Sequence, residues 1–163
     1  MIGQEKVYET LKALGIEFDY LEHPEAPTIE IARQYWKNLD STHCKNLFFR
    51  NHKGNRHYLV IFHCDRNLAI HDLEQLLKQG KLSFASEKRM EKYLGLKPGS
   101  VSPFGLVNDT EHHVYVFLDE NLKQARKLSF HPNDNRASLA IKTEDFIRYM
   151  DHSGNEYEWI RLY

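Results

Sequence analysis

The chain has 163 residues and a mass of 19.3 kDa, which is the size of one domain and is long enough to bury a hydrophobic core without disulfide bonds. Its 22 lysines and arginines against 23 aspartates and glutamates exclude a protein that holds long nucleic acid mainly through bulk positive charge. There is no run of 18 apolar residues, so we expect no membrane span and no signal peptide, and the 2 cysteines should be free thiols in a cytoplasmic protein.

The N-terminal part of the chain predicts a helix, a strand and a second helix. Apolar residues at helical spacing predict a helix over 4–14 that stops at Gly15. Alternating apolar positions over 16–20 predict a strand. After a proline-rich turn, Thr28 is a candidate N-cap for a helix over 29–37.

A β-hairpin is predicted next. The runs CKNLFFR (44–50) and HYLVIFH (57–63) have β-type composition, and Gly54 lies in the turn sequence NHKGN between them. Basic residues near this turn are either phosphate contacts or ordinary solvated side chains of a hairpin tip, namely Arg50, Lys53 and Arg56.

The rest of the chain mixes short helices with strands. Glycines end two predicted helices, one over 71–79 before Gly80 and one that Ser86 opens and Gly95 ends. We then expect a fixed loop over 96–109 leading into a strand, strands over 113–119, 126–131 and 137–142, a helix over 144–151 capped by Thr143, and a closing strand over 157–163. This order predicts an α+β fold in which residues 1–163 form a single domain with a mixed, largely antiparallel central sheet flanked by short helices.

Two His-Cys pairs, His43-Cys44 and His63-Cys64, are candidate zinc ligands if the hairpin places them side by side. Adjacent strand residues point to opposite faces, which works against chelation by one pair, and buried cysteines beside surface histidines explain the same pattern. Either cysteine is also a candidate nucleophile. A thiolate needs a cationic neighbour or a helix N-terminus, however, and both cysteines lie in strand-like runs, so packing is the simpler interpretation.

Three further stretches combine polar residues with turn formers. Lys45 and Asn46 stand at the entrance of a strand, GSVSP (99–103) forms a glycine-proline loop, and HPNDN (131–135) follows a strand that ends in Phe130. Taken singly, each stretch is typical of an ordinary strand edge, loop or turn.

Together with two more motifs, these stretches resemble the YbaK/ProX family of aminoacyl-tRNA editing domains, to which the insertion domain of bacterial prolyl-tRNA synthetases also belongs. The motifs occur in the order HPEAPT, CKNLFF, KLSFAS, GLKPGSVSPFGL and FHPNDN, and the resemblance extends from about residue 5 to about residue 160. It is nearest to the free-standing ProX type, which implies a hydrolase that removes alanine wrongly attached to proline tRNA without a cofactor or a metal.

The resemblance also implies the residues of the site. Lys45, Gly99 and His131 take the catalytic positions, and the substrate-binding positions are Asn46, Ser100, Val101, Ser102, Pro103 and Asn135. Where members of the family commonly have HPLxNTAT, this chain has HPNDNRAS, so Asn135 is kept while Arg136 and Ser138 replace threonines. The departure affects the expected pocket size and substrate choice more than the reaction type.

These residue types suit ester hydrolysis. The Lys45 ammonium can hold the phosphate or ribose of the terminal adenosine, and backbone N–H groups of residues 99–101 can stabilise the oxyanion that forms when water adds. A pocket fitted to a methyl group excludes the proline ring by size. His131 either polarises the water or contacts the amino group, or it only anchors its loop.

Three other functions remain open at this point. They are a deacylase that prefers cysteine on proline tRNA, a non-catalytic aminoacyl-tRNA-binding module, and a metal-binding module. The expected partner is the acceptor end of proline tRNA, with prolyl-tRNA synthetase or an elongation factor as candidate sources of tRNA selection, and neither DNA nor a membrane is expected.

Overall fold

The computed structural model describes residues 1–25 and 29–163, so the N-cap predicted at Thr28 lies outside the described residues. The helices are α1 (Glu5–Ala13), α2 (Ile29–Trp36), α3 (Ile70–Leu77), α4 (Glu87–Leu94) and α5 (Thr143–Ser153), with 3-10 turns η1 (Pro103–Asn108) and η2 (Glu120–Gln124). The strands are β1 (Asp19–Glu22), β2 (Thr42–Asn51), β3 (His57–His63), β4 (Leu82–Phe84), β5 (Tyr115–Asp119), β6 (Lys127–Phe130), β7 (Ala137–Lys142) and β8 (Tyr157–Ile160).

The strands form one mixed sheet in the order β1-β7-β6-β2-β3-β5-β8, with β4 paired to β2 beside this path. Among the described residues, four pairings are antiparallel (β1-β7, β2-β3, β2-β4, β6-β7) and three are parallel (β2-β6, β3-β5, β5-β8). The α+β fold with a mixed sheet and short helices is thereby confirmed.

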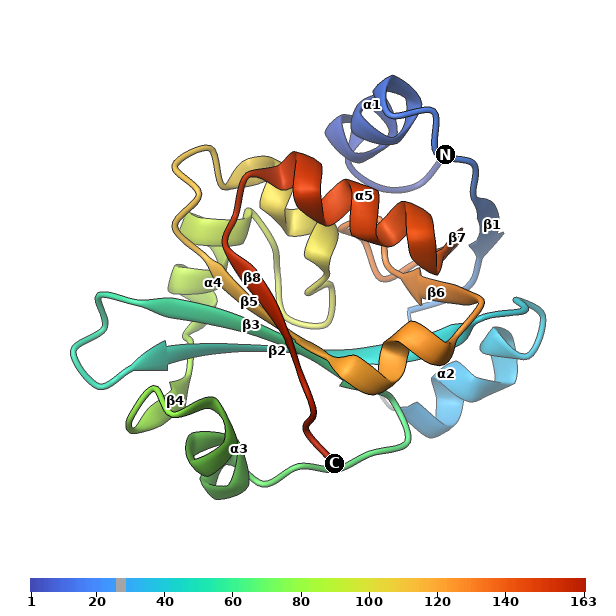
Figure 1. Cartoon of the computed structure of the whole chain (residues 1–163). Helices are drawn as coiled ribbons and strands as arrows, with labels where there is room; N and C mark the ends of the chain where they lie inside the picture. Colours follow the sequence, from blue (N-terminus) through green and yellow to red (C-terminus); the bar gives the residue numbers. More distant parts are fainter. Residues whose placement is uncertain (26–28) are drawn as a thin grey trace.

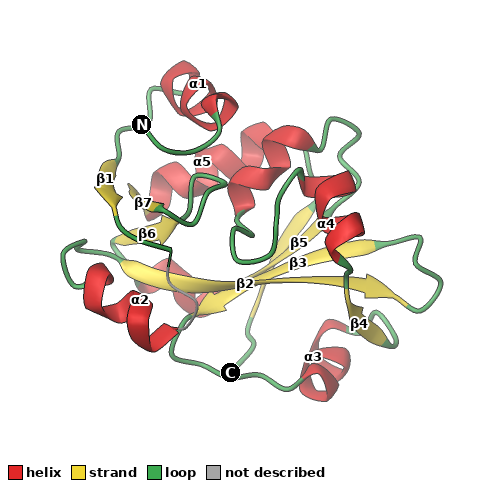
Figure 2. Cartoon of the chain, turned by 180° about the vertical axis from the view of Figure 1, so that it is seen from behind, coloured by secondary structure: helices red, strands yellow, loops and turns green. Residues whose placement is uncertain are grey.

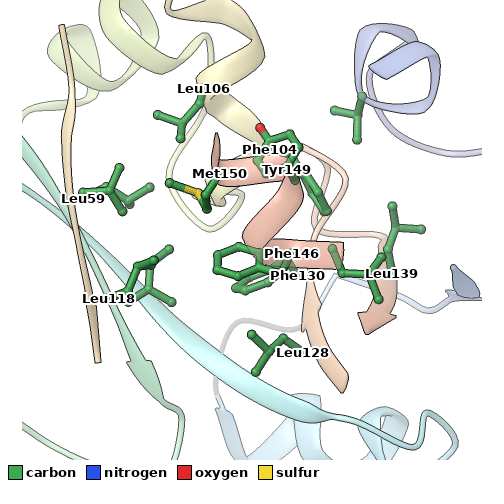
Figure 3. Close-up of a cluster of buried hydrophobic side chains, with 14 of the residues drawn as sticks. Leu59, Phe104, Leu106, Leu118, Leu128, Phe130, Leu139, Phe146, Tyr149 and Met150 are labelled. Carbon is green, nitrogen blue, oxygen red and sulfur yellow. The ribbon is translucent and has the colours of Figure 1, made fainter. Parts of the chain in front are cut away.

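Helices cover both faces of the sheet. In Figures 1 and 2, α1 and α5 lie on one side of the sheet, and α2 and α3 lie on the other. Because side chains alternate along a strand, β3 contributes to both cores: Leu59 and Ile61 face the α5 side, while Val60 and Phe62 face the α3 side. Figure 3 shows the larger core, in which side chains of α5 and η1 meet those of the strands.

The long strand β2 joins the two halves of the sheet, and one of its edges is interrupted. On that edge β2 pairs with β6 only through residues 42–43 and with β4 only through residues 49–51, extended by a hydrogen bond from the Ala85 N–H to the Phe48 carbonyl. Residues 44–47 therefore have no strand partner on this side within the described residues, and we call them the open edge.

Several predicted boundaries are confirmed by their hydrogen bonds. Ser86 caps α4 by accepting a bond from the Arg89 N–H, and Gly95 takes the left-handed conformation that ends the helix. Gly54 has a positive φ of 73° in the turn between β2 and β3. Apolar spacing and turn chemistry are local signals, which is why they predicted these boundaries correctly.

Other predictions were wrong in detail. Lys78, not Gly80, takes the left-handed position at the end of α3. Thr143 is not the N-cap of α5: Lys142 is, and the Thr143 hydroxyl donates to the Ala125 carbonyl. The first strand begins at Asp19, three residues later than predicted.

Three elements were missed altogether. Part of the predicted loop over 96–109 is the 3-10 turn η1, and neither the short strand β4 nor the 3-10 turn η2 was predicted. β4 is only 3 residues long and forms by pairing with β2, so its own sequence carries little signal. None of the helices in the described residues is long and apolar enough to cross a membrane.

Candidate active site

A cavity of about 440 Å³ opens at the open edge of β2. β4 and the start of α4 bound it at one end, the loop before η1 forms a second part of its wall, and His131 directly follows β6. The cavity brings together five residues that the sequence assigned to the site, namely Lys45, Asn46, Gly99, Val101 and His131. Nine other residues complete its mostly apolar lining: Trp36, Cys44, Leu47, Phe48, Cys64, Phe84, Ala85, Met90 and Pro98.

Lys45 is fixed by the loop that follows β3. Its ammonium donates to the Arg66 carbonyl at 2.5 Å and to the Asn67 side-chain oxygen. An ammonium has three N–H donors, and the third has no partner among the described residues, so it is available to a ligand at the cavity. The strand register places Lys45 opposite Phe62, on the α3 side of the sheet.

Asn46 points to the other face and adds polar groups to the open edge. Its amide nitrogen donates to the Cys44 carbonyl at 3.3 Å, whereas its side-chain oxygen is buried without a partner in the described part of the chain. Backbone groups alternate in direction along a strand, and the Phe48 carbonyl points toward β4, so the N–H and C=O of Asn46 point into the open edge as well. A ligand in the cavity thus meets backbone donors and acceptors.

The loop before η1 contributes its backbone on the opposite wall. Gly99 has a φ of +85°, a conformation that glycine adopts without strain, and Val101 lines the cavity. Ser100 is buried, and its N–H donates to the Lys97 carbonyl at 3.0 Å, which closes the turn around Gly99.

Ser102 and Pro103 are not part of the cavity lining; both are buried at the start of η1. The Ser102 hydroxyl accepts a bond from the Phe104 N–H at 3.0 Å, and the Pro103 carbonyl accepts one from the Tyr149 hydroxyl at 2.8 Å. These two residues anchor the loop to the core.

The His131 ring is held as a neutral imidazole. Its Nδ1 lies 2.7 Å from the Ala137 carbonyl, which can only accept, so Nδ1 carries the proton and Nε2 is left as an acceptor. Burial lowers the pKa of His131, and the neighbouring His23, whose ring centroid is 5.8 Å away, acts in the same direction. Nε2 has no hydrogen-bond partner among the described residues, and the ring lines the cavity.

Asn135 lies just behind this wall, outside the cavity lining. Its amide nitrogen donates to the Glu25 carboxylate at 2.8 Å and would be 3.2 Å from a Cβ added at Gly99. The motifs HPEAPT, GLKPGSVSPFGL and FHPNDN therefore meet behind the cavity, through Glu25, Gly99 and Asn135.

The thiols of the cavity are not activated. Burial is the largest cause that raises the pKa of both Cys44 and Cys64, so both stay protonated at neutral pH. His63, Cys64 and Asp65 could in principle hold a metal ion, since their ligand atoms lie within 4.8 Å of one another. Two of these ligands are already engaged, however: Arg33 donates to Asp65, and the His63 Nδ1 accepts from the Asp65 N–H at 2.9 Å.

Sequence reasoning missed most of the apolar lining. Trp36 stacks on His43 with ring centroids 4.3 Å apart, and Met90 and Phe84 come from α4 and β4. Phe84 belongs to KLSFAS, one of the motifs that carry the family resemblance, but nothing in the sequence distinguishes its ring from that of a core phenylalanine.

The chain belongs to the family of aminoacyl-tRNA editing domains, since the family model described as "Aminoacyl-tRNA editing domain" matches residues 23–149. It is 38% identical over 163 residues to the Prolyl-tRNA editing protein ProX of Acetoanaerobium sticklandii, with 99% of each chain covered. It is also 32% identical over 152 residues to the Prolyl-tRNA synthetase associated domain-containing protein 1 of Bos taurus, covering 91% of this chain and 88% of the relative.

The fold is shared with solved structures at lower identity. One structure, described as a candidate trans-editing enzyme for prolyl tRNA synthetase, superposes with a TM-score of 0.72 at 20% identity and covers 96% of this chain and 94% of its own. The family resemblance seen in the sequence motifs is thus confirmed by the sequence relatives, and the architecture by this likeness.

Proposed function

We propose that this protein is a trans-editing deacylase that hydrolyses alanyl-tRNA(Pro), with the whole chain, residues 1–163, acting as one editing domain. The observation that carries the proposal is the mostly apolar cavity that Lys45, Gly99 and His131 line together at the open edge of β2. Membership of the editing family and the name of the ProX relative support the reaction class and the tRNA.

The reaction needs no cofactor in this proposal. A water molecule adds to the carbonyl carbon of the ester, the tetrahedral oxyanion collapses, and the bond from this carbon to the ribose oxygen breaks. The ribose oxygen leaves as a hydroxyl that takes up one proton of the water, alanine leaves as a carboxylate, and the second proton of the water passes to solvent. An adjacent ribose hydroxyl of the substrate helps to position the water.

Each site residue has a physical role in this reaction. The free N–H of the Lys45 ammonium binds the phosphate or ribose of the terminal adenosine and so fixes the ester over the cavity. Backbone N–H groups around Gly99 and along the open edge stabilise the oxyanion, and one such donor typically contributes about 3 kcal/mol. The Nε2 of neutral His131 accepts a hydrogen bond from the water or from the amino group of alanine.

Selectivity follows from size in this proposal. Phe48, Met90 and Val101 belong to the apolar part of the lining. A methyl-sized subsite among them would contact alanine and exclude the bulkier proline ring. A synthetase cannot reject the smaller alanine as strongly, since a missing methylene changes binding by only about 1 to 3 kcal/mol. The partner is the acceptor end of proline tRNA, and prolyl-tRNA synthetase or an elongation factor supplies the remaining tRNA selection.

The test is a deacylation assay with alanyl-, cysteinyl- and prolyl-tRNA(Pro), comparing the wild type with Lys45→Ala and with Lys12→Ala. Lys12 is a matched control because it is an exposed lysine on α1 that does not line the cavity. We expect alanine to be released at a rate that Lys45→Ala abolishes and Lys12→Ala leaves unchanged.

The other outcomes are informative as well. Faster release of cysteine than of alanine would assign the site to cysteinyl-tRNA(Pro). Tight binding of alanyl-tRNA(Pro) with no release above the rate in buffer would replace the enzyme with a binding module.

A further inference from the structure

Phe84 is a large apolar side chain left in solvent beside the cavity. Its exposed fraction is 61%. Among the described residues, the other exposed large hydrophobic residues are Met1 and Ile31. Of these three, only Phe84 lines the cavity. An exposed aromatic ring at the mouth of a ligand site is a typical contact for a planar group.

One face of this ring is already held in place. The β2-β4 register pairs Phe84 with Phe49, and the two ring centroids are 4.7 Å apart at an interplanar angle of 32°. Phe49 itself is fully buried, so it gives Phe84 a rigid support. Little side-chain freedom is then left to lose when a second planar group packs on the exposed face.

Phe84 lies on the same face of the sheet as Lys45. Side chains alternate along β2, so Lys45, Leu47 and Phe49 share one face, and Phe84 sits opposite Phe49 on that face. The cavity lining therefore runs from a cation, Lys45, across an aliphatic residue, Leu47, to an aromatic ring, Phe84.

That order matches the chemistry of one nucleotide. The substrate ester is carried by the ribose of a terminal adenosine, so an adenine base always lies within one nucleotide of the reacting carbonyl. We propose that Phe84 is the stacking platform for this terminal adenine, with Lys45 at the phosphate or ribose and Leu47 beneath the sugar. This inference rests on the proposed function and adds a positioning contact to it.

Base stacking on an aromatic side chain supplies enough binding to matter. Removing such a ring typically weakens binding by roughly 5- to 150-fold, and the contact tolerates any base because every base has a π-face. Phe84 touches the base and not the reacting atoms, so its loss acts mainly through KM and leaves kcat near the wild-type value at saturating substrate.

The experiment compares two substrates and three variants. The substrates are an alanylated CpA dinucleotide and the same alanylated dinucleotide without its terminal base. The variants are Phe84→Leu, which keeps an apolar contact to Phe49, Phe84→Tyr, which keeps the ring, and Ser83→Ala, a control on the same strand outside the cavity lining. Thermal unfolding of each variant reports whether the fold is intact.

We expect Phe84→Leu to lower kcat/KM on the complete dinucleotide by about 10-fold or more. On the substrate without the base it should match the wild type, while Phe84→Tyr and Ser83→Ala stay near the wild type on both. Removing the base from the substrate and removing the ring from the protein eliminate the same contact. Their effects on kcat/KM should therefore be non-additive when the two changes are combined.

Equal losses in Phe84→Leu on both substrates, or no loss on either, would overturn the stacking role. Such a result leaves the proposed function standing as long as the wild type releases alanine and Lys45→Ala does not. If the wild type releases no alanine from alanyl-tRNA(Pro), the proposed function itself fails.

Discussion

The side chain of Asn135 packs against the backbone of Gly99, although 35 residues separate them in the sequence. A Cβ added at Gly99 would lie 3.2 Å from the Asn135 amide nitrogen, which itself donates to Glu25 at 2.8 Å. The contact ties the loop before η1 to the loop after β6 directly behind the cavity, so the position of the Gly99 backbone depends on both loops.

Gly99→Ala should therefore impair deacylation more than it impairs stability. Its φ of +85° disfavours any side chain by about 1 kcal/mol, and the new methyl group also presses on Asn135. Gly80→Ala is the matched control, because Gly80 has a φ of +79° with nothing within 4 Å of an added Cβ. We expect a somewhat larger loss of unfolding free energy in urea for Gly99→Ala than for Gly80→Ala, and a fall in kcat only for Gly99→Ala. Equal kcat values would show that the loop position is unimportant.

Ser102→Ala should act on stability and not on chemistry. The hydroxyl is fully buried and caps η1 through the Phe104 N–H, so its removal should cost about 1 kcal/mol and lower Tm by about 2 to 4 °C. Deacylation measured well below Tm should be unchanged. Loss of activity at an unchanged Tm would instead make Ser102 a substrate contact, as the sequence resemblance implies.

His131 should not produce a titration near pH 6.5 in the rate of deacylation. Burial lowers the pKa of its imidazole below the ordinary value, so the ring is already neutral at pH 6.5 and above. His131 should therefore contribute no inflection above about pH 6.5 when kcat is measured from pH 5 to 8. A wild-type inflection near 6.5 that disappears in His131→Gln would contradict this prediction.

Stability should fall as the pH is lowered from about 6.5 toward 4. Burial lowers the pKa of both His43 and His57 to about 4, while an unfolded chain gives histidine a pKa of about 6.5. Between these values the unfolded state binds more protons than the native state, so acid favours unfolding, and the stability is fully present only above about pH 6.5.

The contacts of His57 explain why it resists protonation. Arg89 donates to its Nε2 at 3.0 Å, so Nδ1 carries the proton and donates to the His113 Nε2 at 2.9 Å. Urea unfolding between pH 4.5 and 7.5 should show a shallower pH slope for His57→Gln than for the wild type. The exposed His71→Gln is the control, and a slope equal to the wild type in both variants would refute the assignment.

Much of the fold could be predicted from the sequence because the signals were local. The Ser86 cap, the Gly95 terminus and the β2-β3 hairpin each depend on a few neighbouring residues. β4 could not be predicted in this way, since it forms only by pairing with β2, which lies 31 residues or more away.

Some features of the candidate site could also be predicted from the sequence, and others could not. The order of the motifs selected Lys45, Gly99 and His131, and these residues do line one cavity. The open edge could not be predicted, because it is a gap between two long-range pairings, β2 with β6 and β2 with β4. Its apolar lining was equally hidden, since Phe48 and Met90 have the spacing of ordinary core residues.

The interruption in β2 also bears on how the sheet keeps backbone groups available to a ligand without offering a long edge to another chain. The unpaired backbone groups of a strand edge can pair with a strand of another chain, and proteins protect such edges with charges, bulges or covering elements. Here the pairings with β6 and β4 close both ends of the four-residue stretch 44–47. A foreign strand would need a longer run of partners than this stretch provides, whereas a single nucleotide does not. The shortness of the gap therefore disfavours edge-to-edge pairing at this place in the sheet.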